Sequence, residues 1–228
     1  MSRPGARNAF TTGGSAPTAR DYVQNGLVAM WDGIENAGWG VHDAATTVWK
    51  DLAGDNNFQN FDNGVFWGDN FFGTSSLLKC ATASLYDENS IKAMECGVAL
   101  NGWYGLVLAQ FASNSNSPGR WFGFRSDGTF NFADRGDCAA AALSVDTISV
   151  FSGVFENGWT LYKDGVSVTS LGAGMYWSDY TGGESSINTV SSYMTSSKIY
   201  FMRLYSRALT SAEIAHNYAV DKARFNLP

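Results

Sequence analysis

The segment that most constrains this fold lies near the end of the chain, at residues 199–225. Ile199–Tyr205 is rich in β-branched and aromatic residues and carries one charge, Arg203, which predicts a strand with at least one buried face. Thr210 follows, with Glu213 three residues later, and this Thr-x-x-Glu spacing is the capping box that begins a helix. The sequence therefore predicts one strand that leads into one helix, which packs against the sheet that contains the strand.

The helix pattern also predicts a buried face and a set of stabilising charges. An apolar stripe is formed by Ile214, Ala215, Tyr218 and Ala219. Charge-assisted hydrogen bonds that hold the closing strand and helix together are expected from four residues: Arg203, Arg207, Arg224 and Asp221. No other stretch shows a comparable helical pattern, so the rest of the chain is predicted as strands and loops.

Short strands separated by turn residues account for most of the remaining sequence. Ile91–Leu100 places Met94, Cys96 and Val98 at a period of two, and Asp-Gly turns follow at residues 127–128 and 164–165. Residues 147–169 are predicted as a three-strand meander. Strands that recur every 8–12 residues, roughly, are typical of an antiparallel sandwich, so residues 21–228 are predicted as one all-β domain.

Charge and hydropathy exclude several classes of partner. The chain of 228 residues has a net charge of -6 and a pI near 4.8, whereas nucleic-acid binding needs a basic face. No apolar run is long enough to span a bilayer, and no signal segment opens the chain. We therefore expect no nucleic-acid partner, no membrane insertion and no Sec-dependent export.

The first twenty residues differ from the domain. Residues 1–20 hold three Arg and no acidic residue, together with Gly, Ser, Thr and Pro. Little apolar surface can be buried here, so a flexible arm is expected in an isolated chain. The alternative is an arm that becomes ordered on a neighbouring subunit of an assembly, with Phe10 as its anchor and its basic charge facing an acidic neighbour.

Two segments carry a family resemblance. The closing segment reads RLYSRALTSAEIAHNYAVDKARF, and the opening one reads GLVAMWDGIENAG, followed by His42 and TTVWKDLAGDNN. Both resemble laminin-G-like domains of bacterial and phage type, which belong to the concanavalin A-like lectin and glucanase group. The resemblance implies a two-sheet antiparallel jelly-roll sandwich with one short C-terminal helix. It implies a fold and not a ligand.

The sequence lacks the catalytic motifs that the resemblance would lead one to expect. Glycoside hydrolases of the group use Glu-x-Asp-x-x-Glu on one strand, and this chain has no such run. Glu95 is the one strand carboxylate that could act as a general acid, and the alternative is an exposed or hydrogen-bonded strand residue. With no nucleophile elbow and only two histidines, the chain is predicted not to be an enzyme.

Two kinds of binding site remain. Family members often bind Ca²⁺ at a rim, and Asp32 and Asn36 offer oxygen ligands in the first loop, although turns use Asp and Asn for other reasons. Sugars stack on exposed rings beside polar groups. Candidates of this kind are Trp177, Tyr176, Asp179, Tyr180 and Trp39. The alternative is that these rings fill the ends of the sandwich.

Three cysteines leave one further alternative open. Cys80, Cys96 and Cys138 share no metal-binding spacing, so they are expected as buried thiols, with a Cys80–Cys96 bridge as the alternative.

Together these observations predict a non-catalytic recognition module. It would bind a surface glycan or protein, as an exposed part of a phage virion or a cell surface, in the manner of an adhesion lectin. The alternative is a structural virion protein, such as a decoration, tail or fibre component, that its arm docks on neighbouring subunits. A glycoside hydrolase is the third alternative.

Overall fold

The computed structural model describes most of the chain in eleven stretches. They are residues 15–59, 65–74, 78–80, 91–99, 107–112, 120–124, 130–133, 147–156, 158–172, 184–187 and 198–228.

Within these stretches the chain forms two antiparallel sheets and one C-terminal helix, α1 (Ser211–Phe225). The larger sheet has eight strands: β1 (Leu27–Asp32), β3 (Val65–Trp67), β4 (Phe72–Thr74), β6 (Ala93–Ala99), β10 (Ser149–Phe155), β11 (Gly158–Lys163), β12 (Val166–Gly172) and β14 (Lys198–Tyr205). The smaller sheet has six: β2 (Phe58–Gln59), β5 (Leu78–Cys80), β7 (Val107–Ala112), β8 (Arg120–Phe124), β9 (Phe130–Ala133) and β13 (Glu184–Ile187). The predicted meander is confirmed as β10, β11 and β12, which pair in sequence order.

The predicted closing strand, β14, lies inside the larger sheet. One edge pairs with β6, from Lys198 opposite Ala99 to Tyr205 opposite Ala93. The other edge pairs first with β4 and then with β1, which runs from Leu27 to Asp32. Strands from both ends of the chain are therefore joined through this one segment.

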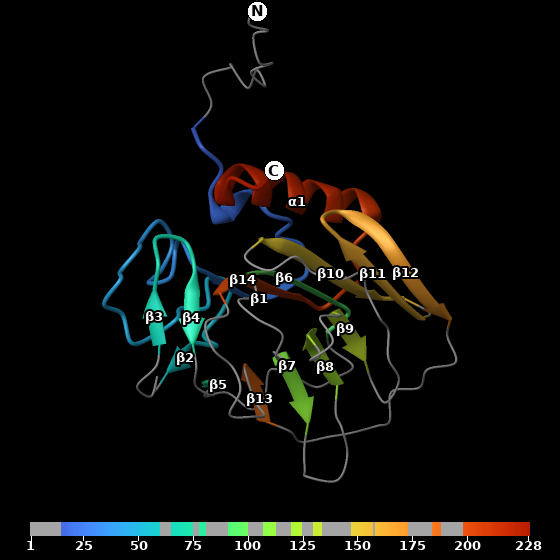
Figure 1. The fold of residues 1–228 in the computed structure, drawn as a ribbon, viewed down its shortest axis with the longest axis horizontal. Helices are drawn as coiled ribbons and strands as arrows, with labels where there is room; N and C mark the ends of the chain where they lie inside the picture. Colours follow the sequence, from blue (N-terminus) through green and yellow to red (C-terminus); the bar gives the residue numbers. More distant parts are fainter. Residues whose placement is uncertain are drawn as a thin grey trace, which may run out of the picture.

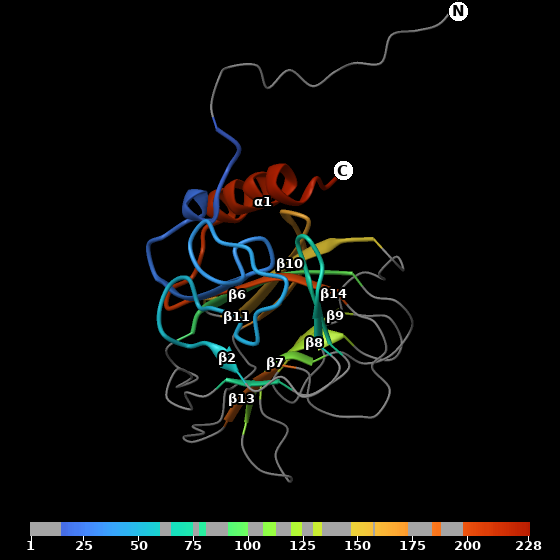
Figure 2. The same ribbon diagram turned by 90° about the vertical axis from the view of Figure 1, so that its left-hand side faces the viewer.

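Helix α1 covers one face of the larger sheet, and the smaller sheet lies beneath the other face (Figure 1). The view turned by 90° shows the same order of layers (Figure 2). Between the sheets lies an aromatic cluster of Trp31, Trp49, Phe58 and Phe72, whose buried rings have centroids as close as 4.8 Å. Aromatic burial of this extent supplies much of the core.

The helix begins as predicted, but its buried face differs from the predicted one. Thr210 and Glu213 form the capping box, with both reciprocal hydrogen bonds present. Ile214 is buried, whereas two other members of the predicted stripe, Ala215 and Ala219, are exposed. The buried positions are Ile214, Asn217, Val220, Asp221 and Phe225. Polar residues can occupy this face because the sheet beneath supplies charged partners for them.

The N-terminal segment contacts the helix before the first strand begins. Residues 1–14 lie outside the described residues. Thr18 caps the 3-10 turn η1 (Ala19–Asp21), in which Ala19 is fully buried. The boundary predicted at residue 20 thus falls inside a capped turn that is packed on the domain. No helix among the described residues is both long and apolar enough to cross a membrane.

Candidate binding site and the buried charges beneath the helix

Arg203, at the centre of β14, forms two fully buried ion pairs. Its Nε lies 2.9 Å from Glu95 Oε2 on β6. Its two terminal nitrogens donate to the two carboxylate oxygens of Asp221 on α1, at 2.9 and 2.8 Å. The fork of one guanidinium thus joins a neighbouring strand and the covering helix, which confirms the structural role predicted for Arg203 and Asp221.

Neutral groups complete the hydrogen bonding of both carboxylates. Asn217 on α1 and Ser152 on β10 donate to Glu95, at 2.8 and 3.0 Å. The hydroxyl of Tyr22 donates to Asp221 at 2.7 Å. Buried ion pairs are tolerated when the remaining lone pairs are satisfied in this way.

Burial dominates the titration of both acids. It raises the pKa of Glu95 above its ordinary 4.5 and the pKa of Asp221 above its ordinary 3.8, even though Arg203 opposes each shift. Glu95 is bound on the helix-covered face of the sheet, so the alternative of a hydrogen-bonded strand residue is confirmed.

A second arginine ties the end of the helix to the first loop. Arg224 donates to both carboxylate oxygens of Asp32 and, at 3.0 Å, to Glu35 Oε1. Glu35 also accepts from the amides of Ala19 and Gly40, each at 2.8 Å. This second cluster joins α1, the N-terminal segment and the loop after β1. Arg224 thus has the predicted structural role, but its partners lie in the first loop and not in the closing strand.

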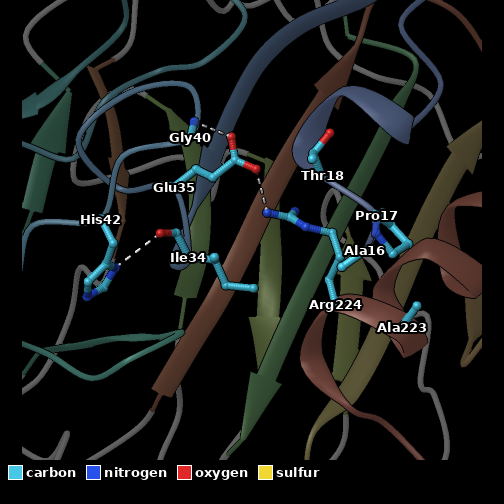
Figure 3. Close-up of a pocket in the computed structure, with 9 residues that line it drawn as sticks. All are labelled: Ala16, Pro17, Thr18, Ile34, Glu35, Gly40, His42, Ala223 and Arg224. Atoms are coloured by element: carbon cyan, nitrogen blue, oxygen red, sulfur yellow. Dashed lines mark hydrogen bonds and ion pairs between the residues drawn. The ribbon is translucent and has the colours of Figure 1, made fainter. Parts of the chain in front are cut away.

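A cavity of about 430 Å³ opens beside this second cluster (Figure 3). Its lining combines small aliphatic groups with polar ones: Ala16, Pro17, Thr18, Ile34, Glu35, Gly40, His42, Ala223 and Arg224. His42 is exposed, and its Nδ1 lies 3.1 Å from the carbonyl of Ile34. The lining combines a carboxylate, a guanidinium, an imidazole and a hydroxyl with aliphatic groups, a mixture that is common in small-ligand sites.

The two predicted metal ligands occupy the same loop. Asp32 accepts from the amides of Ile34 and Glu35 in addition to Arg224. Asn36 exchanges two hydrogen bonds with the backbone of Asp43, at 2.9 and 2.8 Å. In the described part of the chain, no three His, Cys, Asp or Glu side chains gather as metal ligands would. The calcium site stays a prediction.

Of the five predicted sugar-binding residues, the structure describes one, Trp39. Trp39 is half-buried, and the guanidinium of Arg20 stacks 4.2 Å from the centre of its ring. The other four, Tyr176, Trp177, Asp179 and Tyr180, lie outside the described residues. Their segment connects β12 in the larger sheet to β13 in the smaller one.

The bridge between Cys80 and Cys96 is excluded, because Cys96 is a free, buried thiol on β6. Its position between the sheets is that of a small core side chain.

Sequence reasoning missed the pairing of Glu95 with Arg203 and Asn217. The signal was present, because each is a polar residue in an otherwise apolar strand or helix face. The sequence does not show which of these polar residues pair, because that depends on the strand register that places Glu95 on β6 opposite Arg203 on β14.

Comparisons with known proteins show a shared fold. No family model and no curated protein matches the sequence. Among solved structures, a sialidase of Trypanosoma rangeli in complex with sialic acid aligns with a TM-score of 0.67 and 12% identity, over 93% of this chain and 34% of that chain. The receptor-binding domain of botulinum neurotoxin C/D mosaic serotype aligns with a TM-score of 0.61 and 13% identity, over 86% of this chain and 52% of that domain. The binding domain of Paraclostridial Mosquitocidal Protein 1 gives the same score and coverage at 15% identity.

The chain therefore spans about a third of the sialidase and about half of each binding domain. At these identities the similarity shows the class of fold alone, an antiparallel β domain with a C-terminal helix, and it does not show a shared activity or ligand.

Proposed function

We propose that this chain is a non-catalytic recognition domain of the jelly-roll, laminin-G-like kind, which binds a glycan or a protein on a surface. The observation that carries the proposal is the fold similarity to two binding domains of toxins, each over 86% of this chain. The two-sheet sandwich is the scaffold that this proposal requires, with recognition by the loops that connect the sheets.

The buried acids favour binding over catalysis. Most retaining and inverting glycosidases use two carboxyl groups that face one substrate, although sialidases use a tyrosine nucleophile instead. Here Glu95 and Asp221 are both bound to Arg203 beneath the helix, and Asp32 and Glu35 are both bound to Arg224. These four acids hold the scaffold together, so they are poorly suited to proton transfer.

The ligand site is assigned to the segment that contains Tyr176, Trp177, Asp179 and Tyr180, because its sequence combines three rings with an acid among Gly and Ser residues. The cavity beside Glu35 and His42 is a second place where a small ligand fits. A role in a virion assembly, through residues 1–20, stays a prediction of the sequence.

A glycan array followed by calorimetry tests the proposal. We expect binding by the wild type, a loss of at least about tenfold in affinity for Trp177→Ala (the order of 1.4 kcal/mol), and little change for Ser178→Ala in the same segment. Equal affinity of the wild type and Trp177→Ala would remove this site. Binding to no glycan and to no surface protein would remove the proposed function.

The sialidase similarity supplies one specific alternative, a hydrolase. A fluorogenic sialoside and a β-glucan distinguish the two functions, because a recognition domain binds without turnover. Steady release of product by the purified chain would favour the hydrolase and contradict the proposal.

A further inference from the structure

Strand β12 (Val166–Gly172) forms one end of the larger sheet. The order of the sheet begins β12, β11, β10, and no described strand lies beyond β12 (Figure 1). Antiparallel pairing with β11 uses the backbone groups of one side only. Among the described strands none pairs with the other side, whose amide and carbonyl groups can pair with another strand.

The side chains of this edge carry no charge, and two of them are exposed valines. Val166 and Val168 are 67% and 41% exposed, and they are two of the three large exposed hydrophobic residues in the described part of the chain. Natural edge strands commonly carry Lys or Pro, which prevent pairing with another chain. The sequence of this strand, VSVTSLG, contains neither.

From this edge we propose that β12 pairs with β12 of a second copy of this chain, antiparallel about a twofold axis, so that the two larger sheets become continuous. Such a contact is self-complementary, since each strand offers the other the same groups. Two molecules of net charge -6 would meet at a strand without charge.

The expected affinity is modest. Seven residues at ~3.4 Å each give a contact about 24 Å long. One strand pair buries less than the roughly 1,200 Å² of a standard stable interface. The register shift in β12 opposite Leu161 and Tyr162 also bends the strand and shortens the regular stretch. We therefore expect a dimer that dissociates at concentrations on the order of 10 µM.

Sedimentation velocity of the full chain, from about 1 to about 500 µM, tests the proposal around that midpoint. The wild type should shift from 24.6 kDa toward twice that mass as concentration rises. Val168→Lys should remain monomeric across the series. Val41→Lys is the matched control, because Val41 is 50% exposed but lies outside β12, and it should associate as the wild type does.

Hydrogen exchange adds a local measurement, in which amides of β12 gain protection as the wild-type concentration rises. A wild type that stays monomeric throughout would overturn the proposal and would mean that the bend in β12 is sufficient protection. Dimers of Val168→Lys at wild-type affinity would overturn it as well. Both results are independent of glycan binding, so the proposed function can fail or hold separately.

Discussion

Replacing Arg203 by Met removes the one positive charge shared by two buried carboxylates. The side chains of Arg203, Glu95 and Asp221 are at most 1% exposed, so water cannot solvate the acids that remain. Breaking a buried ion pair from one side costs about 3–5 kcal/mol. For a domain of this size that free energy corresponds to a fall in Tm of roughly 6–20 °C.

The matched control is Arg207→Met. Arg207, four residues before α1, pairs with Glu213 in the first turn of that helix, but the two side chains are 29% and 28% exposed. An exposed pair contributes at most about 1 kcal/mol. We therefore expect a fall in Tm of no more than roughly 4 °C at pH 7. Thermal unfolding followed by circular dichroism measures both variants.

The pH dependence provides a second measurement of the same interaction. Glu95 and Asp221 have raised pKa values in the folded domain. Their contribution to stability is therefore fully present below their ordinary pKa values of 4.5 and 3.8, and it is lost as the pH rises through their pKa values in the folded state. Without Arg203 both pKa values rise further. The loss of stability of Arg203→Met relative to the wild type should therefore be larger at pH 7.5 than at pH 5. Arg207 lowers the pKa of Glu213 to about 2, so this pair stabilises the domain more as the pH rises. The pair is intact in both the wild type and Arg203→Met, so it does not affect their difference in stability.

The reasoning would be refuted if Arg203→Met lost no more stability than Arg207→Met, or if Arg203→Met lost the same amount of stability at pH 5 and at pH 7.5. Adding Asp221→Asn to Arg203→Met keeps an acceptor for Tyr22 and removes one buried charge. The double variant should therefore be more stable than Arg203→Met alone.

Three further predictions concern the cap, one turn and the first loop. Thr210→Ala should lower the stability by about 1 kcal/mol in thermal unfolding, while Thr210→Ser should keep it. Gly165→Ala should destabilise the domain more than Gly40→Ala: both glycines have positive φ, but only at Gly165 would the new Cβ lie 2.9 Å from the ring of Tyr218. EDTA should leave Tm unchanged, since Asp32 is already bound by an arginine and two amides, and a clear fall would instead support calcium in this loop.

Local signals in the sequence predicted the elements that depend on near neighbours. The Thr210 and Glu213 spacing predicted the start of the helix, and the composition of Ile199–Tyr205 predicted the strand before it. Both features depend on residues within one turn or one strand, which the sequence contains.

The buried face of the helix could not be predicted in the same way. Asn217 and Asp221 look like solvent-facing residues until Glu95 and Arg203, more than a hundred residues apart in sequence, are placed beneath them. The distribution of charge between buried and exposed positions is set by strand register, which a hydropathy pattern does not specify. The cavity beside Glu35 and His42 was missed for the same reason, since its walls come from both ends of the chain.

The position of β14 has a consequence for synthesis on the ribosome. Strands β1, β4 and β6 leave the exit tunnel early, yet each has its neighbour in a segment that begins only at Lys198. Until that segment emerges, the nascent chain holds apolar edges with no native partner, for which chaperones would be expected to compete. Strands β1 and β6 should therefore acquire β14 as a neighbour only after residues 198–205 have emerged, and a stall before residue 198 should leave an aggregation-prone intermediate.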